Sequence, residues 1–211
     1  MTQILVIGAS KGIGRAVAKQ ASAAGYAVRA LSRGSGHSAE PGLEWFSADA
    51  RDPDALARAL EDVDVVVQTL GVPTGPELLC KPVTLFSEAT SALLPAMRAS
   101  DVRRLISVTG YGAGDSRASI SCLPGLAFEL ILGRAYADKD VQETLIRESD
   151  RDWTIVRPVI LTNGPRLGRY KVLDDPGRWR NGLISRRDVA DFIVRQLEDD
   201  IYIRKAPVVR Y

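Results

Sequence analysis

Short apolar runs alternate along the chain with segments in which apolar residues recur at helical spacing. The runs predict buried strands over 3–7, 27–32, 43–48, 64–69, 104–109, 153–157 and 206–209. The helical spacing predicts helices over 12–24, 53–60, about 84–99, about 138–149 and near 187–198. Short continuous apolar runs are typical of strands that are covered on both faces. Repeated strand–helix–strand units therefore predict an α/β fold with a doubly wound parallel sheet.

The chain length and the spacing of its loops favour one domain. With 211 residues, of which 45% are apolar and 26% charged, the chain is expected to bury a sizeable core as a single domain over 1–211. Two stretches rich in glycine and serine, 33–42 and 110–125, interrupt the pattern and are predicted to be loops.

Charge and cysteine content exclude several classes of function. The formal net charge is +2 and no long basic run is present, so neither nucleic acid nor a membrane is expected as a partner. Cys80 and Cys122 are isolated and His37 is the only histidine, so no metal site is expected. We expect no signal peptide, because the first apolar run is too short, and we expect a cytoplasmic location with reduced cysteines.

A glycine-rich turn, GASKGIGR over 8–15, joins the first predicted strand to the first predicted helix. Such glycines allow a tight turn, a close approach to a pyrophosphate and close packing of the helix on the strand, while the helix N-terminus attracts the phosphates. A turn without a ligand is the alternative, and a mononucleotide P-loop is not favoured because no Gly-Lys-Ser/Thr follows. The cofactor-binding residues expected in this turn are Gly8, Ser10, Lys11, Gly12, Ile13 and Gly14.

The end of the second predicted strand indicates which dinucleotide is bound. A site for NAD needs an acidic side chain there, about 20 residues past the glycines, to hold the ribose 2′-hydroxyl. This chain has Ser32 and Arg33 instead, and the next acid is Glu40. The Arg33 guanidinium can bind a 2′-phosphate, and Lys11 can reach the same group. The pattern therefore favours NADP(H), although Arg33 could also be a solvated loop charge.

The glycine spacing resembles that of the short-chain dehydrogenase/reductase superfamily, whose Rossmann-type NAD(P)-binding fold the resemblance implies for the whole chain. In that superfamily an acidic residue after the third strand contacts the adenine, which is the place of Asp49 and Ala50 here. The tetrapeptide 68–71, QTLG, occupies the place of the turn beside the adenine ribose. The resemblance therefore adds Asp49, Ala50, Leu70 and Gly71 to the expected cofactor site.

The second half of the chain is similar to the small atypical members of that superfamily. The segments 152–158 (DWTIVRP), 161–165 (LTNGP) and 184–192 (ISRRDVADF) carry this likeness to the NAD(P)H-binding, NmrA-like group, which includes biliverdin reductase B, a flavin reductase. The resemblance implies that Pro158, Val159 and Ile160 pass the nicotinamide, and that about 150–211 completes the substrate pocket. Without this resemblance, Arg157-Pro158 would indicate only the end of a strand, where proline is tolerated.

The usual catalytic residues of the superfamily are altered. Serine at the end of the fifth strand is replaced by Tyr111, or by Thr109 if the register shifts. The tyrosine–lysine pair is contracted to Tyr136-Ala-Asp-Lys139, which has one residue too few but still shares a helix face. We expect Thr109, Tyr111 and Lys139 as catalytic candidates, with Thr109 and Lys139 also contacting the cofactor, Tyr111 as a pocket wall and Lys139 as its charged rim.

Lys139 also has a purely structural alternative. It can pair with Glu143 one helical turn later, and Glu143 can in turn pair with Arg147. If Lys139 formed an ion pair with Glu143 on the helix surface, it would not face the cofactor.

Taken together, these features favour an NADPH-dependent oxidoreductase that passes hydride to a flavin or to a small carbonyl- or quinone-like acceptor. The contracted tyrosine–lysine pair leaves open a binding protein that senses NADP(H) without turnover. A nucleotide-sugar epimerase is less favoured because the short C-terminal region leaves little room for a substrate domain. A small-molecule substrate is the expected partner, and monomer and homodimer are not distinguished.

Overall fold

The computed structural model describes residues 1–34, 40–72, 83–119 and 122–211, with side chains described from 133 onward in the last range. His37 and Cys80 lie outside the described residues, as does the side chain of Cys122. The predictions that concern these three side chains are therefore not addressed by the structure.

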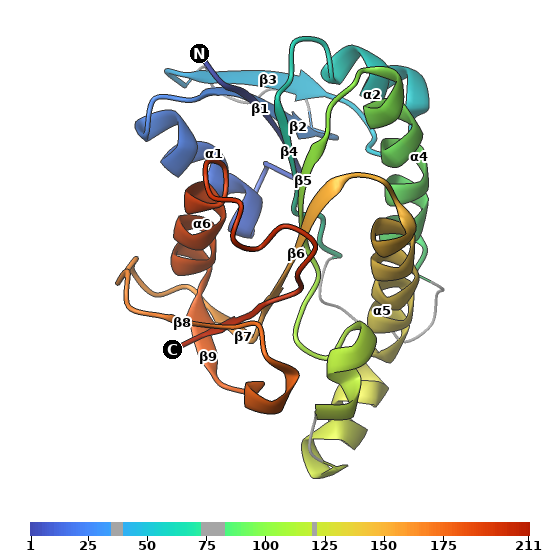
Figure 1. Cartoon of the computed structure of the whole chain (residues 1–211), viewed down its shortest axis with the longest axis vertical. Helices are drawn as coiled ribbons and strands as arrows, with labels where there is room; N and C mark the ends of the chain where they lie inside the picture. The colour runs from blue at the N-terminus through green and yellow to red at the C-terminus, as the bar shows by residue number, and fades with distance from the viewer. Residues whose placement is uncertain (35–39, 73–82, 120–121) are drawn as a thin grey trace.

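An eight-stranded sheet forms the centre of the molecule (Figure 1). Its strands are β1 (Gln3–Ile7), β2 (Ala27–Ser32), β3 (Leu43–Ser47), β4 (Val65–Gln68), β5 (Arg104–Val108), β6 (Asp152–Pro158), β8 (Lys171–Leu173) and β10 (Val208–Arg210). The spatial order is β3-β2-β1-β4-β5-β6-β10-β8, and every pair is parallel except β10 with β8. The order reverses between β1 and β4, which is where open sheets of this type bind ligands at their carboxyl ends.

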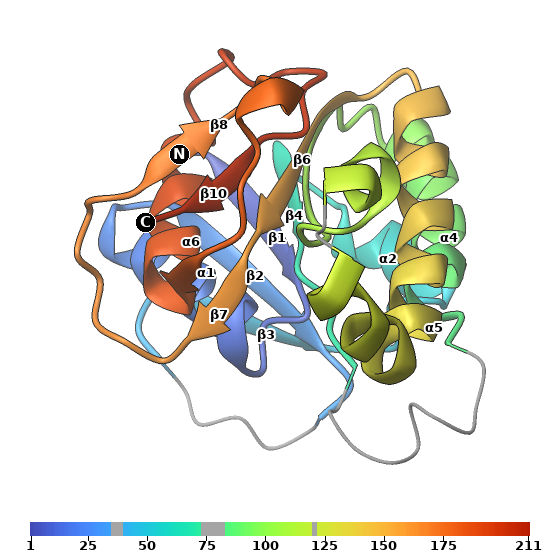
Figure 2. The ribbon, with the colours of Figure 1, turned by 90° about the horizontal axis from the view of Figure 1, so that it is seen from below.

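Helices cover both faces of the sheet. Their bounds are α1 (Gly12–Ala23), α2 (Pro53–Ala59), α4 (Leu85–Ala99), α5 (Cys122–Glu148) and α6 (Arg186–Arg195). Figure 2 shows α1 and α6 on one side of the sheet and α2, α4 and α5 on the other. Successive residues of β1 serve the two cores: Ile4 and Val6 pack toward α1 and α6, whereas Leu5 and Ile7 pack toward the other helices. The prediction of a doubly wound, mostly parallel α/β sheet is confirmed.

Local sequence signals fix where several elements begin. Asp52 accepts hydrogen bonds from the backbone N–H groups of Asp54 and Ala55, and Pro53 stands at the first position of α2. Ser185 likewise caps α6 by accepting from the N–H of Asp188 at 3.0 Å. Capping of this kind satisfies N–H groups that have no partner within the helix.

The largest difference from the sequence-based expectation concerns α5, which begins at Cys122 rather than near 138. The segment expected as a loop over 110–125 also contains a 3-10 turn, Gly114–Ser119. Pro124, Gly125 and Gly133 have low helix propensity, so local preference does not announce the first half of this helix. The strands β7 (Ile160–Thr162), β8 and β9 (Leu183–Ser185) were not predicted, because runs of three residues carry too little pattern.

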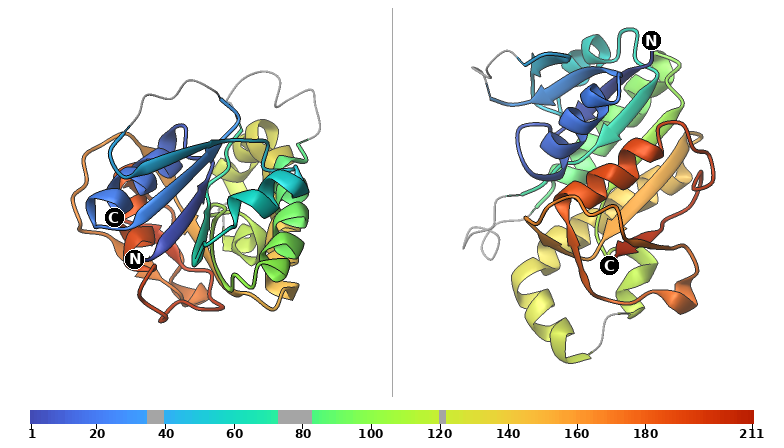
Figure 3. Two further views of the ribbon diagram at one scale, coloured as in Figure 1. Left: turned by 90° about the horizontal axis from the view of Figure 1, so that it is seen from above. Right: turned by 90° about the vertical axis from the view of Figure 1, so that its left-hand side faces the viewer.

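The C-terminal part of the chain returns to the first helix. β7 pairs with β9 in a separate two-stranded sheet, and β9 leads directly into α6. The helix α6 lies against α1, as the right-hand view of Figure 3 shows. This packing brings residues from the two ends of the sequence to the same edge of the central sheet.

Candidate functional site

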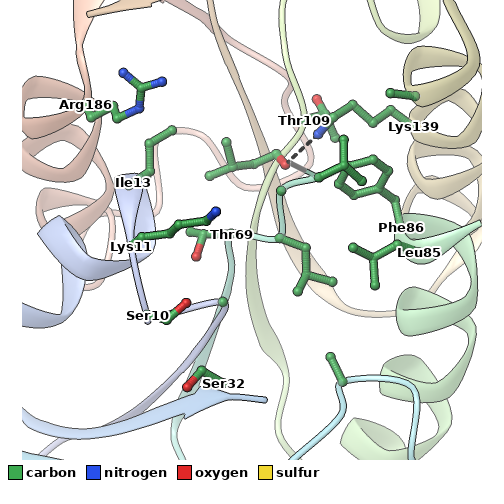
Figure 4. Close-up of a pocket in the computed structure, with 18 of the residues that line it drawn as sticks. Ser10, Lys11, Ile13, Ser32, Thr69, Leu85, Phe86, Thr109, Lys139 and Arg186 are labelled. Atoms are coloured by element: carbon green, nitrogen blue, oxygen red, sulfur yellow. Dashed lines mark hydrogen bonds between the residues drawn. The ribbon is translucent and has the colours of Figure 1, made fainter. Parts of the chain in front are cut away.

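A cavity of about 610 Å³ opens at the carboxyl ends of the central strands, at the point where the strand order reverses (Figure 4). The predicted cofactor and catalytic residues that line it are Gly8, Ser10, Lys11, Gly12, Ile13, Ser32, Arg33, Asp49, Ala50, Leu70, Gly71, Thr109, Lys139 and Pro158. These residues come from segments distributed over the first three quarters of the chain. The fold therefore gathers most of the expected site into one hollow.

The glycine loop forms the floor of this cavity. Gly12 adopts a φ of +62°, in the left-handed region that favours glycine. Apart from its chain neighbours and its own helix backbone, the described atoms within 4 Å of the place of a Cβ there belong to Arg186. Gly14 does not line the cavity. A Cβ on Gly14 would collide with the carbonyl of Gly8 and with the side chain of Thr69, so this glycine allows α1 to pack closely on the sheet.

The first turn of α1 is suited to an anion. Its N-cap residue, Lys11, makes no side-chain cap, and the first turn contains no acidic residue. N–H groups at a helix start that lack such caps attract phosphate groups, and the positive end of the helix dipole adds to this attraction. The residues that are present therefore fit the pyrophosphate of a dinucleotide.

Two cationic side chains, one after β2 and one in the glycine loop, line the cavity. Arg33 and Lys11 both line it, and among the described residues no carboxylate lies within the 4.0 Å ion-pair distance of either. Glu40, the next acid along the chain, is engaged elsewhere, by Arg15 and by Lys19 at 3.7 Å. The absence of an acid at the second strand's end, as read from the sequence, thus corresponds to a positively charged pocket wall.

Asp49 also lines the cavity, but its carboxylate is already occupied. It accepts hydrogen bonds from the backbone N–H of Arg51 at 3.0 Å and from the Arg51 guanidinium at 2.8 Å. These bonds, with the nearby charge of Arg33 as a smaller cause, lower the pKa of Asp49 to about 2. Any adenine contact by Asp49 would have to use lone pairs that Arg51 leaves available.

The cavity also holds a buried lysine. The Lys139 ammonium lies 4.1 Å from the centre of the Phe86 ring and 3.5 Å from the carbonyl oxygen of Val108. Burial lowers the pKa of Lys139 to about 8, against the opposing effects of Glu143 and then Asp138. Lys139 therefore lines the cavity, as expected, but as a buried charge.

Glu143 explains why Lys139 has this position. Instead of pairing with Lys139, its carboxylate receives the Arg157 guanidinium, with Nε at 3.0 Å and Nη2 at 2.5 Å. Arg147 lies 3.9 Å from Glu143, in agreement with the predicted pairing of these two residues. Arg157 is fully buried and also pairs with Asp115.

Thr109 is fixed by the same carboxylate. Its hydroxyl donates to Glu143 Oε1 at 2.7 Å, and the side chain lines the cavity. Because a hydroxyl has one proton, Thr109 offers the cavity only oxygen lone pairs. It can accept a hydrogen bond from a ligand but has no proton to give.

The two tyrosines lie differently from each other. Tyr136 lines the cavity beside Gly110, and burial together with the charge of Glu143 raises the pKa of its phenol to about 12. Tyr111 is buried and is not among the residues that line the cavity, and its hydroxyl donates to the Ser119 carbonyl at 2.9 Å. The expected role of Tyr111 as a wall of the pocket therefore finds no support in its placement.

Of the residues expected beside the nicotinamide, one lines the cavity and two do not. Pro158 lines the cavity, whereas Val159 is buried and Ile160 is exposed on β7, and neither is among the lining residues. Lining residues that the sequence did not indicate are Leu31, Ala48, Val72, Leu85, Phe86, Val108, Ala135, Leu161, Asn163 and Arg186. Most are apolar and could not be distinguished from core residues in the sequence. Arg186 reaches the cavity only because α6 packs on α1.

Two further structural observations bear on the class of protein. No described helix is long and apolar enough to span a membrane. Within the described ranges, no group of three or more histidine, cysteine, aspartate or glutamate side chains is arranged to hold a metal ion.

The sequence is similar to known NAD(P)H-binding proteins. A family profile described as NAD(P)H-binding matches residues 8–200. An uncharacterized chloroplastic protein of Arabidopsis thaliana is 27% identical over 202 residues, which cover 92% of this chain and 71% of that protein. The match to the family extends from the glycine loop to the end of the last helix, so it includes every element that lines the cavity.

Solved structures share the same arrangement of elements. ChuY, an anaerobillin reductase from Escherichia coli O157:H7, superposes with a TM-score of 0.83 at 23% identity, over 99% of this chain and 97% of that chain. A wide-type short-chain dehydrogenase/reductase from Veillonella parvula, in complex with NADP, gives a TM-score of 0.81 at 17% identity, over 100% and 94% of the two chains. At these identities the likeness shows the fold.

Proposed function

The chain belongs to the NAD(P)H-binding family, as its resemblance to the atypical short-chain dehydrogenases/reductases predicted, and on this premise we propose that it is an NADPH-dependent reductase. Its acceptor is a flavin or another conjugated, carbonyl- or quinone-like compound. The observation that carries the proposal is that one cavity is lined by the glycine loop, by Lys11 and Arg33, and by Thr109 and the buried Lys139.

The preference for NADPH rests on charge at the adenosine end. Arg33 follows β2, where an NAD-binding site would present an acid, and Lys11 lines the same cavity from the glycine loop. Asp49, a carboxylate that also lines the cavity, is paired with Arg51. An arginine fork binds a phosphate with two hydrogen bonds, whereas it gains little from a 2′-hydroxyl. The 2′-phosphate is therefore the group that this wall complements.

The bound cofactor supplies a hydride, which carries two electrons and one proton to the acceptor. The acceptor then takes a second proton from solvent, so that its reduction is complete. The side chains of this protein hold the reacting groups face to face, and the apolar residues Ile13, Phe86 and Leu161 keep water away from them. A conjugated acceptor suits such a site, because the anion formed when hydride arrives is delocalised and needs little help from an acid.

Lys139 and Thr109 have complementary tasks in this scheme. The buried ammonium of Lys139 stabilises negative charge on the acceptor as hydride arrives, an effect that is strong where water is excluded. Thr109 accepts a hydrogen bond from an N–H of the bound groups, because its own proton is committed to Glu143. Tyr136 is a poor proton donor, since its pKa is raised rather than lowered.

A panel of acceptors tests the proposal. NADPH oxidation would be followed with FMN, a simple quinone, an aldehyde and a linear tetrapyrrole, the last because ChuY shares this fold and is a reductase of anaerobillin. We expect turnover with at least one conjugated acceptor and little with the aldehyde, whose alkoxide needs a proton donor. Tight NADPH binding without turnover on any acceptor would instead support a sensor.

A further inference from the structure

Arg186 stands at the start of α6 and lines the cavity beside the glycine loop, on the same side as Ile13 (Figure 4). Its Cδ and Nε atoms each lie 4.0 Å from the position that a Cβ on Gly12 would occupy. Gly12 is the residue at which α1 begins, so the Arg186 side chain borders the space in front of the helix N-terminus. No sequence motif assigns this arginine to the cofactor.

The charge of Arg186 is not balanced by an acid in the described part of the chain. The hydrogen bond that its guanidinium makes goes to a neutral group, the amide oxygen of Asn163, at 2.8 Å. No carboxylate among the described residues lies within 4.0 Å of it. A guanidinium has five N–H groups in a planar fork, so several remain for an anion in the cavity. The first turn of α1 on the other side of this space also lacks an acid.

We propose that Arg186 is a second binding group for the pyrophosphate of the dinucleotide, opposite the N–H groups of α1, and that it couples cofactor binding to the acceptor side of the pocket. The inference rests on the proposed function only for its dinucleotide site. A pyrophosphate carries two negative charges, and the start of α1 presents only the partial positive charge of a helix end. A cation facing that helix end supplies the missing charge.

The coupling between the cofactor and the acceptor side follows from the hydrogen bonds that join the segment 163–168 to α6. Asn163 comes directly after β7 and is bonded to Arg186, while the N–H groups of Leu167 and Gly168 donate to Asp188 at 2.9 Å and 2.7 Å. Both ends of the segment are thus fastened to the first turn of α6. Leu161 and Asn163 line the cavity beyond the glycine loop. A ligand that fixes Arg186 therefore also fixes the segment that borders the acceptor.

Two variants with the same change of charge test the binding role. Arg186→Gln removes the proposed contact, and Arg187→Gln is its control. Arg187 is exposed and does not line the cavity, and it is the backbone carbonyl of Arg187 that accepts from Gln20 on α1. Calorimetric titration would measure NADPH and adenosine 2′-monophosphate, which has the adenine-side phosphate but no pyrophosphate. We expect Arg186→Gln to weaken NADPH by about tenfold or more while leaving adenosine 2′-monophosphate unchanged.

Three outcomes would overturn this role. Unchanged NADPH affinity in Arg186→Gln would remove the arginine from the cofactor site. Equal weakening of both ligands, or equal effects in Arg187→Gln, would show a general loss of positive charge or of folding. Arg186→Gln could also keep its affinity for NADPH and lose affinity for FMN, while its affinity for the uncharged lumiflavin stays the same. In that case Arg186 would bind the phosphate of the acceptor instead. None of these readouts requires turnover, so the binding role is tested separately from the proposed reductase activity.

Hydrogen exchange tests the coupling. At saturating NADPH we expect slower amide exchange over 163–168 in the wild type and in Arg187→Gln, because the ligand holds Arg186 and through it Asn163. In Arg186→Gln, at NADPH concentrations that saturate the variant, this protection should be lost while the glycine loop stays protected. Protection of 163–168 that persists in Arg186→Gln would contradict the coupling.

Discussion

The hydroxyl of Thr109 donates to Glu143 at 2.7 Å, so this threonine faces the cavity as a hydrogen-bond acceptor only. In the superfamily a serine usually stands near this position, and the sequence identifies it only as a polar group beside the substrate. The sequence does not show to which group such a hydroxyl donates its proton. Here the direction is set by a carboxylate that also holds the buried Arg157. The direction of this hydrogen bond is thus determined together by Thr109, which follows β5, and by residues of α5 and β6.

Thr109→Val should lower kcat/KM by about tenfold, the loss expected for one neutral hydrogen bond between Thr109 and an N–H of a bound group. Thr109→Ser keeps the oxygen and should behave like the wild type. Steady-state NADPH oxidation with FMN would measure both. Wild-type kinetics in Thr109→Val would mean that no ligand donates to this oxygen.

Glu143→Gln should reduce the free energy of unfolding by about 3 kcal/mol, because it leaves the buried Arg157 with only the exposed Asp115 as a charged partner. Urea denaturation followed by circular dichroism would measure the loss. The control is Arg103→Gln, which breaks a surface pair with Asp152 and should cost less than about 1 kcal/mol. Equal losses in the two variants would contradict the account of the buried network.

The activity should fall as pH rises through about 8, because burial lowers the pKa of Lys139 to about 8 and the protonated form is the one proposed to stabilise the reduced acceptor. A pH profile of kcat/KM in the wild type would show this limb. Lys139→Met should be slower at neutral pH and should lack the limb. A limb that persists in Lys139→Met would assign the titration to another group.

Lys139→Met should also make the protein more stable at neutral pH. The pKa of Lys139 in the folded protein, about 8, is below the ordinary value of 10.5, so folding disfavours its charged form. The free energy of unfolding of the wild type should therefore rise with pH between about 8 and 10.5, as Lys139 loses its charge. The advantage of Lys139→Met over the wild type, up to about 3 kcal/mol near pH 7, should shrink over the same range. Urea denaturation at neutral and alkaline pH would reveal the trend, and a destabilised variant would contradict it.

Tyr136→Phe should lower turnover by less than about tenfold, because the raised pKa of this phenol makes it a poor proton donor. Tyr111→Phe is a matched control, since the Tyr111 hydroxyl bonds to Ser119 outside the cavity. The measurement is NADPH oxidation with FMN. A loss of about a thousandfold in Tyr136→Phe alone would restore the usual tyrosine acid.

The parts of this protein that could be predicted are those encoded locally. The first strand, its glycine loop and the amphipathic helix that follows are contiguous, so their pattern predicts both the fold and the phosphate-binding turn. Arg33 was predicted in the same way, as the residue that follows the second strand, and it lines the cavity, while its role stays a prediction. The parallel sheet and the helices on both of its faces then followed from repetition of such units, whereas the strand order is known only from the structure.

The parts that could not be predicted depend on packing between distant segments. Arg186 reaches Gly12 only because α6 lies against α1, and no local pattern encodes that contact. Lys139 appeared suited to a surface pair with Glu143, and only the arrival of Arg157 from β6 shows why Glu143 is engaged elsewhere. Tyr111 follows a strand end, as pocket residues do, yet it is buried and does not line the cavity.

The measurement that tests the central claim most directly is kcat/KM for NADPH and for NADH, with FMN as acceptor, in the wild type and in Arg33→Ala. Arg33 lines the adenosine end of the cavity, where a charged hydrogen bond to the 2′-phosphate is worth about 1.5–3 kcal/mol. We predict FMN-dependent oxidation that favours NADPH, and a loss of about tenfold or more for NADPH but almost none for NADH in Arg33→Ala. No FMN-dependent oxidation, or equal losses with the two cofactors, would contradict the account.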